Sequence, residues 1–232
     1  MKPGLTGRSK SRSNAEEDGS RFGFRKETVR LVWIARKDLP SSALGGVFGP
    51  GELSPEADDS CIGCAAGGHC IGFGRGAGFN LPYLLACVGP EGKIVALDYS
   101  EGMLAAAQRK AQRHGWKNVN FVKADATQMD MEANILDGAI CTFGLSAMPG
   151  ELGALQRVAK AMKPGARFVA FDAKPFTGWG SVMNPISQPL FKYSTNWDYR
   201  KDAVASLRSV FSVLEVQEHN SGCNYIAVGR KS

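Results

Sequence analysis

From about residue 70 onward, short apolar runs alternate with stretches in which apolar residues recur at helical spacing. Short continuous apolar runs are typical of strands buried on both faces of a sheet, whereas the longer periodic stretches predict helices. The predicted strands are Cys70–Gly74, Lys93–Asp98, Val119–Lys123, Gly138–Phe143, Arg167–Asp172, Ser212–Glu218 and Asn224–Gly229. The predicted helices are Leu81–Val88, with Pro82 in its first turn, then Ser100–His114, Glu151–Met162 and Asp202–Phe211.

The order of these elements predicts an α/β fold with a doubly wound sheet. Strands separated by helices form parallel pairs, with the helices packed on both faces. The last two strands are joined only by a short turn around Ser221 and Gly222, which suits an antiparallel hairpin and is too short for a parallel crossover. We therefore expect a mostly parallel seven-stranded sheet that ends in a C-terminal antiparallel hairpin.

Composition divides the chain into three parts. Residues 1–20 are poor in apolar side chains and rich in Ser, Gly and basic residues, which predicts a disordered basic tail. Residues 21–67 have no clear period and form a poorly defined segment, whereas residues 68–232 carry the folded domain. The domain is long enough to bury a core without disulfides or metals.

The net charge of +6 is concentrated at the N-terminus. Residues 1–37 hold ten Lys/Arg and four Asp/Glu, and the other 195 residues hold eighteen of each sign. The domain is therefore electrically neutral, which argues against a specific nucleic-acid partner. No apolar run is long enough to span a bilayer, although contact with a membrane surface remains compatible with the sequence. The oligomeric state is left open.

The chain has six cysteines, and three of them lie with a histidine at a spacing that resembles a metal site: Cys61, Cys64, His69 and Cys70. All four candidates fall within ten residues, whereas a structural zinc site usually needs two separated ligand pairs, so we expect no metal and reduced thiols. Reduced cysteines favour a cytoplasmic protein. The remaining cysteines in apolar segments, interpreted as core residues, are Cys87 and Cys141.

A glycine-rich turn, Gly74-Arg-Gly76-Ala-Gly78, connects the first predicted strand to the first helix. Glycines let a ligand approach the backbone, and a following helix directs free N–H groups at it. Asp98 ends the next strand, where a carboxylate can accept hydrogen bonds from ribose hydroxyls. Together these features predict a nucleoside-containing cofactor, although Asp98 could instead serve only as an acid that precedes a helix. Phe79 stands where a dinucleotide fingerprint requires its third glycine, which opposes a nicotinamide dehydrogenase.

A further candidate follows the third strand. The Asp125 carboxylate could accept a hydrogen bond from an adenine amino group, while the N–H of Ala126 binds a ring nitrogen. The alternative is an aspartate that forms an Asx-turn and has no contact with a ligand.

These motifs, in this order, resemble those of the class I S-adenosylmethionine-dependent methyltransferases. The segment from Asp98 to Met103 is most similar to the group related to ubiquinone/menaquinone C-methyltransferases, and the resemblance covers about residues 68–229. It implies strand order 3-2-1-4-5-7-6 and S-adenosyl-L-methionine as cofactor, with the glycine turn near the methionyl group, Asp98 at the ribose and Asp125 at the adenine. The cofactor-binding residues that it implies are Gly74, Gly76, Gly78, Asn80, Asp98, Tyr99, Met103, Asp125, Ala126 and Thr142.

The resemblance places the methyl acceptor near the loops Phe143–Ala147 and Lys174–Arg200. The second loop is long and rich in aromatic residues, so we expect it to form a wall or lid over a small hydrophobic, lipid-like or quinone-like acceptor. The alternative is a solvated surface insertion. The residues expected at the acceptor are Leu145, Trp179 and Phe191. No catalytic base is assigned.

One departure leaves two other functions open. The family usually has an acid two residues before the first glycine of the turn, where this chain has Gly72. A catalytically impaired nucleoside-binding protein of the same fold therefore remains an alternative, and a nicotinamide-dependent oxidoreductase is a weaker one.

Overall fold

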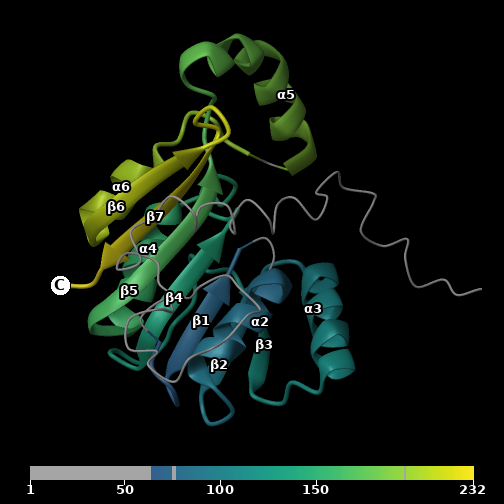
Figure 1. The fold of residues 1–232 in the computed structure, drawn as a ribbon, viewed down its shortest axis with the longest axis vertical. Helices are drawn as coiled ribbons and strands as arrows, with labels where there is room; N and C mark the ends of the chain where they lie inside the picture. Colours follow the sequence, from purple (N-terminus) through teal and green to yellow (C-terminus); the bar gives the residue numbers. More distant parts are fainter. Residues whose placement is uncertain (1–63, 75–76, 196) are drawn as a thin grey trace, which may run out of the picture. The chain divides into compact units, whose positions relative to one another are not determined.

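The structure is a computed structural model that describes residues 64–74, 77–195 and 197–232 (Figure 1). Seven strands in these ranges form one sheet in the order β3-β2-β1-β4-β5-β7-β6, which confirms the predicted topology. The strands are β1 (His69–Phe73), β2 (Lys93–Asp98), β3 (Val119–Lys123), β4 (Leu136–Thr142), β5 (Met162–Ala173), β6 (Ser212–His219) and β7 (Asn224–Arg230). The helices are α2 (Ala77–Val88), α3 (Glu101–His114), α4 (Glu151–Ala161), the 3-10 helix η1 (Gly178–Met183), α5 (Asn184–Thr195) and α6 (Ala203–Val210).

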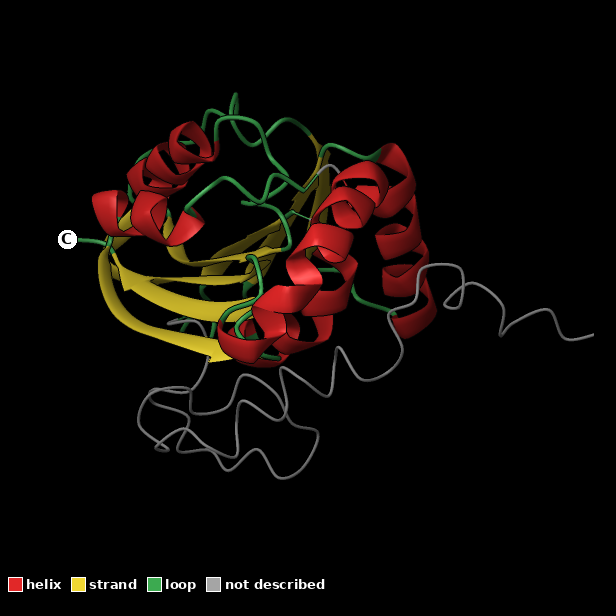
Figure 2. Cartoon of the chain, turned by 90° about the horizontal axis from the view of Figure 1, so that it is seen from above, coloured by secondary structure: helices red, strands yellow, loops and turns green. Residues whose placement is uncertain are grey.

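The sheet is doubly wound, as expected. β1 to β5 pair in parallel, whereas β7 pairs antiparallel with both β5 and β6. Helices cover both faces (Figure 2): α2 and α3 pack on β1, β2 and β3, while α4 and α6 pack together beside β5, β6 and β7. The core between the sheet and α6 includes Phe168, which stacks on Phe211 with ring centroids 4.9 Å apart.

Helix α3 shows how local sequence sets the boundaries of an element. The Ser100 hydroxyl accepts the N–H of Met103 and caps the start, while Gly115 adopts a left-handed conformation (φ 70°) and ends the helix. Both boundaries agree with the prediction.

Helix α2 begins earlier than predicted, at Ala77 rather than Leu81, so Pro82 lies inside it and not in its first turn. Proline has no N–H to donate to the carbonyl four residues earlier, which here belongs to Gly78. The Lys110 ammonium of α3 donates to that carbonyl instead, at 3.0 Å. This contact replaces the missing hydrogen bond and explains how the helix continues through a proline.

A second difference concerns the start of the fifth strand, because the sequence predicts a helix through Met162 and a strand only from Arg167. The strand β5 already begins at Met162, and Gly165 has a left-handed backbone (φ 79°) where the pairing between β4 and β5 shifts register. The Gly165 N–H donates to the carbonyl of Lys231 at 2.9 Å. Pairing with the end of the chain thus extends the strand through the glycine.

The cysteine prediction is partly wrong. Cys64 and Cys70 form a disulfide, with Cα atoms 6.5 Å apart, and Cys87 is also disulfide-bonded. A turn at Gly67, whose N–H donates to the Val88 carbonyl, brings Cys64 beside β1, a proximity that residue spacing does not reveal. Cys141 is a free, buried core residue, as expected.

Some predictions fall on other parts of the chain. The tail of residues 1–20, most of residues 21–67, Cys61 and Gly76 lie outside the described residues. Within the described ranges, no three His, Cys, Asp or Glu side chains gather as a metal site. No helix in those ranges has the length and apolar character needed to cross a bilayer.

Candidate functional site

The carboxyl ends of the five parallel strands meet at one edge of the sheet, where open α/β sheets usually bind ligands. This carboxyl edge carries the turn after β1, the acid that ends β2 and the loops that follow β3, β4 and β5. The predicted site residues that the structure describes therefore come from neighbouring loops, although they lie far apart in sequence.

Gly74 begins the turn after β1 and contacts the loop after β4. Its φ is 87°, and a Cβ atom there would lie 2.9 Å from the Thr142 carbonyl oxygen and 3.0 Å from the Gly144 Cα. Gly144 is restricted in the same way, because its Cβ would lie 2.9 Å from the Gly74 Cα. Two glycines thus allow the loops after β1 and β4 to touch.

The next two predicted residues lie in the first turn of α2, and the structure gives them packing roles. A Cβ at Gly78 would lie 3.0 Å from the Ala107 Cβ, so this glycine allows α2 to approach α3 closely. Asn80 is buried and donates through Nδ2 to the Thr142 hydroxyl at 2.6 Å. This bond fixes the start of α2 against the end of β4.

Asp98 ends β2, as predicted, and is buried. Because Leu97 pairs with Phe73 of β1, Asp98 comes level with the start of the glycine turn at Gly74. Its Oδ1 accepts the N–H of Ser100 at 2.8 Å, which orients the carboxylate at the start of α3. Tyr99 is largely exposed, and Met103 is half-buried in the first turn of the same helix. A buried acid at this position can accept hydrogen bonds from two vicinal hydroxyls of a ribose.

Asp125 follows β3 and forms the Asx-turn that the sequence offers as an alternative. Its Oδ1 accepts both the N–H and the hydroxyl of Thr127, each at 2.8 Å, which is an Asx-turn. Ala126 has its side chain in the core, so only its backbone could contact a ligand. The turn holds the loop at the carboxyl edge and remains compatible with an adenine beside it.

Gly72, the departure from the family pattern, lies inside the fold. A Cβ there would lie 3.3 Å from the Leu84 Cδ1 and 3.5 Å from the Ile140 Cγ2. A carboxylate at this position would therefore be buried among apolar side chains at a high cost in free energy. The position suits a glycine for packing reasons.

The residues predicted at the acceptor do not form one wall. Leu145 is fully buried in the core, and Trp179 lies at the other extreme, 97% exposed on η1. Phe191 of α5 packs edge-on against Trp197, with ring centroids 6.0 Å apart. The segment after β5 is thus mainly helical, and Trp197, rather than Trp179, is its buried aromatic residue.

Asp172, a fully buried carboxylate near the end of β5, is absent from the sites that the sequence predicts. It accepts the N–H of Ser146 at 3.0 Å and also the Ser146 hydroxyl, so it ties the loop after β4 to β5. Burial raises the pKa of Asp172, against the opposing effect of these hydrogen bonds. The signal was present: β5, like β2, is an apolar run that reaches an acid near its carboxyl end.

Neighbours of Asp172 are buried as well. Burial, and then the Asp172 charge, raise the pKa of the Cys141 thiol well above its usual value, and the same two causes raise that of the Tyr225 phenol. Both groups therefore stay neutral at physiological pH. The turn beside them is strained, since Phe143 adopts a left-handed backbone (φ 47°), which side-chain-bearing residues rarely do.

Comparison with known proteins shows that this chain is similar to methyltransferases. Residues 71–165 match the family model described as a methyltransferase domain. The chain is 34% identical over 85 residues to a demethylmenaquinone methyltransferase of Lactococcus lactis, covering 37% of this chain and 34% of that protein. It is 33% identical over 97 residues to one from Geobacillus stearothermophilus, covering 42% of each. The matches therefore span well under half the length of these curated relatives.

Solved structures agree on the fold. A SAM dependent methyltransferase from Aquifex aeolicus has a TM-score of 0.56 at 22% identity, with 90% of this chain and 100% of that chain covered. A putative methyltransferase from Bacillus halodurans has a TM-score of 0.57 at 18% identity, with 83% and 72% covered. At these identities the likeness shows a shared fold.

Proposed function

We propose that this chain, which belongs to the class I S-adenosylmethionine-dependent methyltransferases, binds that cofactor at its carboxyl edge and methylates a small hydrophobic, quinone-like acceptor. The observation that carries the proposal is Asp98, a buried acid at the end of β2 whose orientation is fixed by Ser100, beside the glycine turn at Gly74. An acid at this position can accept hydrogen bonds from the two ribose hydroxyls of a nucleoside.

When bound, S-adenosylmethionine supplies a methyl group on a positively charged sulfur. The chain's own contribution is to position the reactants. Asp98 accepts the ribose hydroxyls, the loop of Asp125 and Ala126 borders the adenine, and the first turn of α2 directs its N–H groups at the ligand. Holding two reactants in line can lower a barrier by about 7–11 kcal/mol, which suits a site without an assigned base.

Two observations support a quinone-like acceptor. The curated relatives that match are demethylmenaquinone methyltransferases, although the match spans only part of each. The segment after β5, next to the expected acceptor position, exposes apolar and aromatic side chains in place of charged ones. Both favour an acceptor that is itself apolar.

The test is a transfer assay with S-adenosylmethionine that is radiolabelled on its methyl group. Candidate acceptors are a naphthoquinol that carries a short isoprenoid chain next to a free ring carbon, a catechol and a primary amine. We expect label in the naphthoquinol only, and Asp98→Asn, which retains an acceptor oxygen for Ser100, should lower the rate at limiting cofactor. Label in the amine would refute the acceptor class. Binding of S-adenosylhomocysteine with no labelled product from any acceptor would favour the impaired alternative.

A further inference from the structure

Large apolar side chains exposed to solvent are concentrated in one segment of the described chain. This segment, residues 177–195, comprises η1 and α5 and is called the apolar arm below. Of the nine large hydrophobic residues exposed within the described ranges, seven belong to the apolar arm, and the other two are Tyr99 and Leu152. Those of the arm are Trp179, Val182, Met183, Ile186, Leu190, Phe191 and Tyr193.

The apolar arm is held in place at its base. The Phe176 N–H donates to the Asn184 side chain at 2.9 Å, and that side chain returns a bond to the Phe176 carbonyl at 3.0 Å. The Thr177 N–H donates to the Ser221 carbonyl in the turn between β6 and β7. Figure 1 shows the arm beyond the carboxyl end of β5. The exposed side chains therefore belong to a positioned element at the carboxyl edge.

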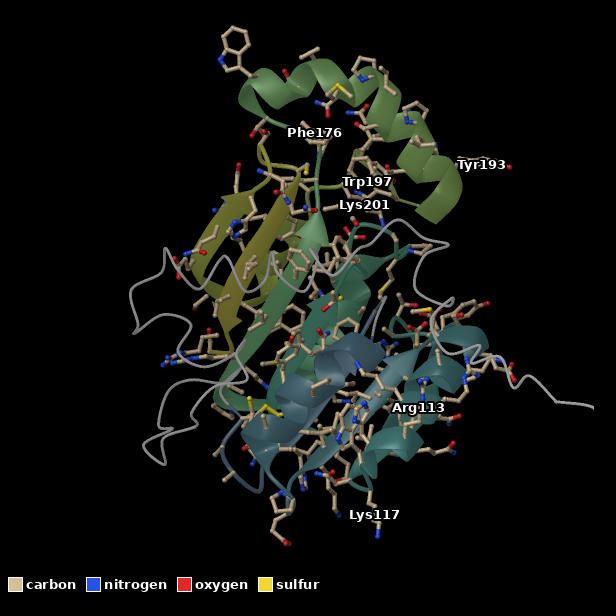
Figure 3. The ribbon with its side chains drawn as sticks, turned by 45° about the vertical axis from the view of Figure 1, so that its right-hand side comes forward. Arg113, Lys117, Phe176, Tyr193, Trp197 and Lys201 are labelled. Atoms are coloured by element: carbon tan, nitrogen blue, oxygen red, sulfur yellow. A yellow bond between two sulfur atoms is a disulfide. The ribbon has the colours of Figure 1, made fainter. Side chains whose placement is uncertain are left out.

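The exposure is extreme at both ends of the apolar arm. Trp179 is 97% exposed and Tyr193 95%, while Ile186 between them is 64% exposed. Figure 3 shows Tyr193 pointing away from the molecule, whereas Trp197 lies on the inner side of α5. Many exposed apolar side chains concentrated in one segment usually mark a surface that binds something apolar.

The distribution of charge along the chain indicates what kind of partner the apolar arm would bind. The apolar arm contains a single charged residue, Lys192, and no acid. Residues 1–37 carry ten basic and four acidic side chains, and the rest of the chain is balanced. Trp and Tyr flanking aliphatic side chains suit the boundary between lipid headgroups and acyl chains, and basic residues add attraction to anionic lipids.

We propose that the apolar arm docks the protein on an anionic lipid bilayer, with Trp179, Ile186 and Tyr193 inserted at the headgroup boundary. Docking brings the carboxyl edge of the sheet next to the membrane, because the arm follows β5 directly. An acceptor dissolved in the bilayer then reaches the site without crossing water. The docking itself requires no methyl transfer, so its test is independent of the proposed function.

The experiment is co-sedimentation of the full chain with vesicles of phosphatidylcholine alone or with about one third phosphatidylglycerol. We expect stronger binding to the anionic vesicles, and a loss of about tenfold or more in the partition coefficient for the double variant Trp179→Ser/Ile186→Ser. The matched control is Leu152→Ser on α4, an exposed apolar residue outside the apolar arm, which should bind as the wild type does. Because these side chains are exposed, the variants should keep the wild-type melting temperature, which calorimetry checks.

Tryptophan emission gives a second measurement. Anionic vesicles should shift the wild-type emission to shorter wavelength, and Trp179→Phe should remove most of that shift while still binding. Undiminished binding by the double variant would overturn the proposal, because the basic tail alone would then account for it. The proposal would also be overturned if the wild type did not bind vesicles but formed a dimer in sedimentation velocity and the double variant did not. The apolar arm would then be a self-association surface.

Discussion

Replacing Lys110 by methionine should destabilise the fold through the carbonyl of Gly78, 32 residues earlier in the chain. Pro82 cannot donate to that carbonyl, and the Lys110 ammonium does so at 3.0 Å. Burial lowers the pKa of Lys110, with a smaller effect from Arg113, so the ammonium is held there at some cost. Methionine keeps most of the apolar stem and removes the donor.

The magnitude follows from leaving a partly buried carbonyl without a partner, which costs about 1–3 kcal/mol. With a urea m-value of about 2 kcal/mol/M, the unfolding midpoint should fall by roughly 1 M. The same substitution in a Pro82→Ala background should cost less than about 0.5 kcal/mol, because an alanine at that position supplies a backbone N–H to the Gly78 carbonyl.

Urea unfolding of the wild type, both single variants and the double variant measures this coupling. Arg109→Met is the control, since Arg109 is exposed on the same helix and its loss should change stability little. An equal loss from Lys110→Met in the two backgrounds would refute the reasoning. The stabilising contact of Lys110 would then be another one, such as the Trp116 ring 5.9 Å away.

Three further predictions concern the carboxyl edge. Burial raises the pKa of Asp172 in the folded state above its value in the unfolded state. The contribution of Asp172 to stability is therefore greatest at acid pH and declines as pH rises through the folded pKa. Asp172→Asn should remove this contribution from the pH dependence of the unfolding free energy. Gly144→Ala should lower both the stability and the S-adenosylhomocysteine affinity measured by titration calorimetry, since its Cβ would lie 2.8 Å from the Cys141 sulfur. The control Gly153→Ala has open space around its Cβ, so it should leave the affinity unchanged and raise stability by about 0.5–1 kcal/mol. Phe191→Ala should raise the acceptor KM in steady-state kinetics and leave the cofactor Kd constant in titration calorimetry. An equal change in both quantities would mean that Phe191 supports the fold as a whole.

The order of strands and helices could be predicted because its signals are local. Apolar runs end in an acid or a glycine, and α3 has its serine cap and its left-handed glycine in the sequence itself. The start of α2 could not be predicted, because glycines and Pro82 disfavour a helix and the compensating contact comes from Lys110 on another helix. The disulfide between Cys64 and Cys70 depends in the same way on a turn that sequence spacing does not specify.

In the candidate site, too, features with a local sequence signal were predictable and long-range contacts were not. Asp98 was predictable as an acid that ends a buried strand, and Asp172 carries the same signal near the end of β5. The bond between Asn80 and Thr142 joins residues 62 positions apart and has no local signature. Trp179 shows the limit of composition, because an aromatic residue in a long segment suits a pocket wall and an exposed surface equally well.

The most direct test of the central claim is titration calorimetry of the full chain with S-adenosylhomocysteine and with NADH. If the carboxyl edge binds S-adenosylmethionine through Asp98, the wild type binds S-adenosylhomocysteine and not NADH. Asp98→Ala then weakens that binding by about 1–3 kcal/mol, the cost of ribose hydroxyls left without a partner. Binding of NADH, or an unchanged S-adenosylhomocysteine affinity in a folded Asp98→Ala variant, would contradict the account.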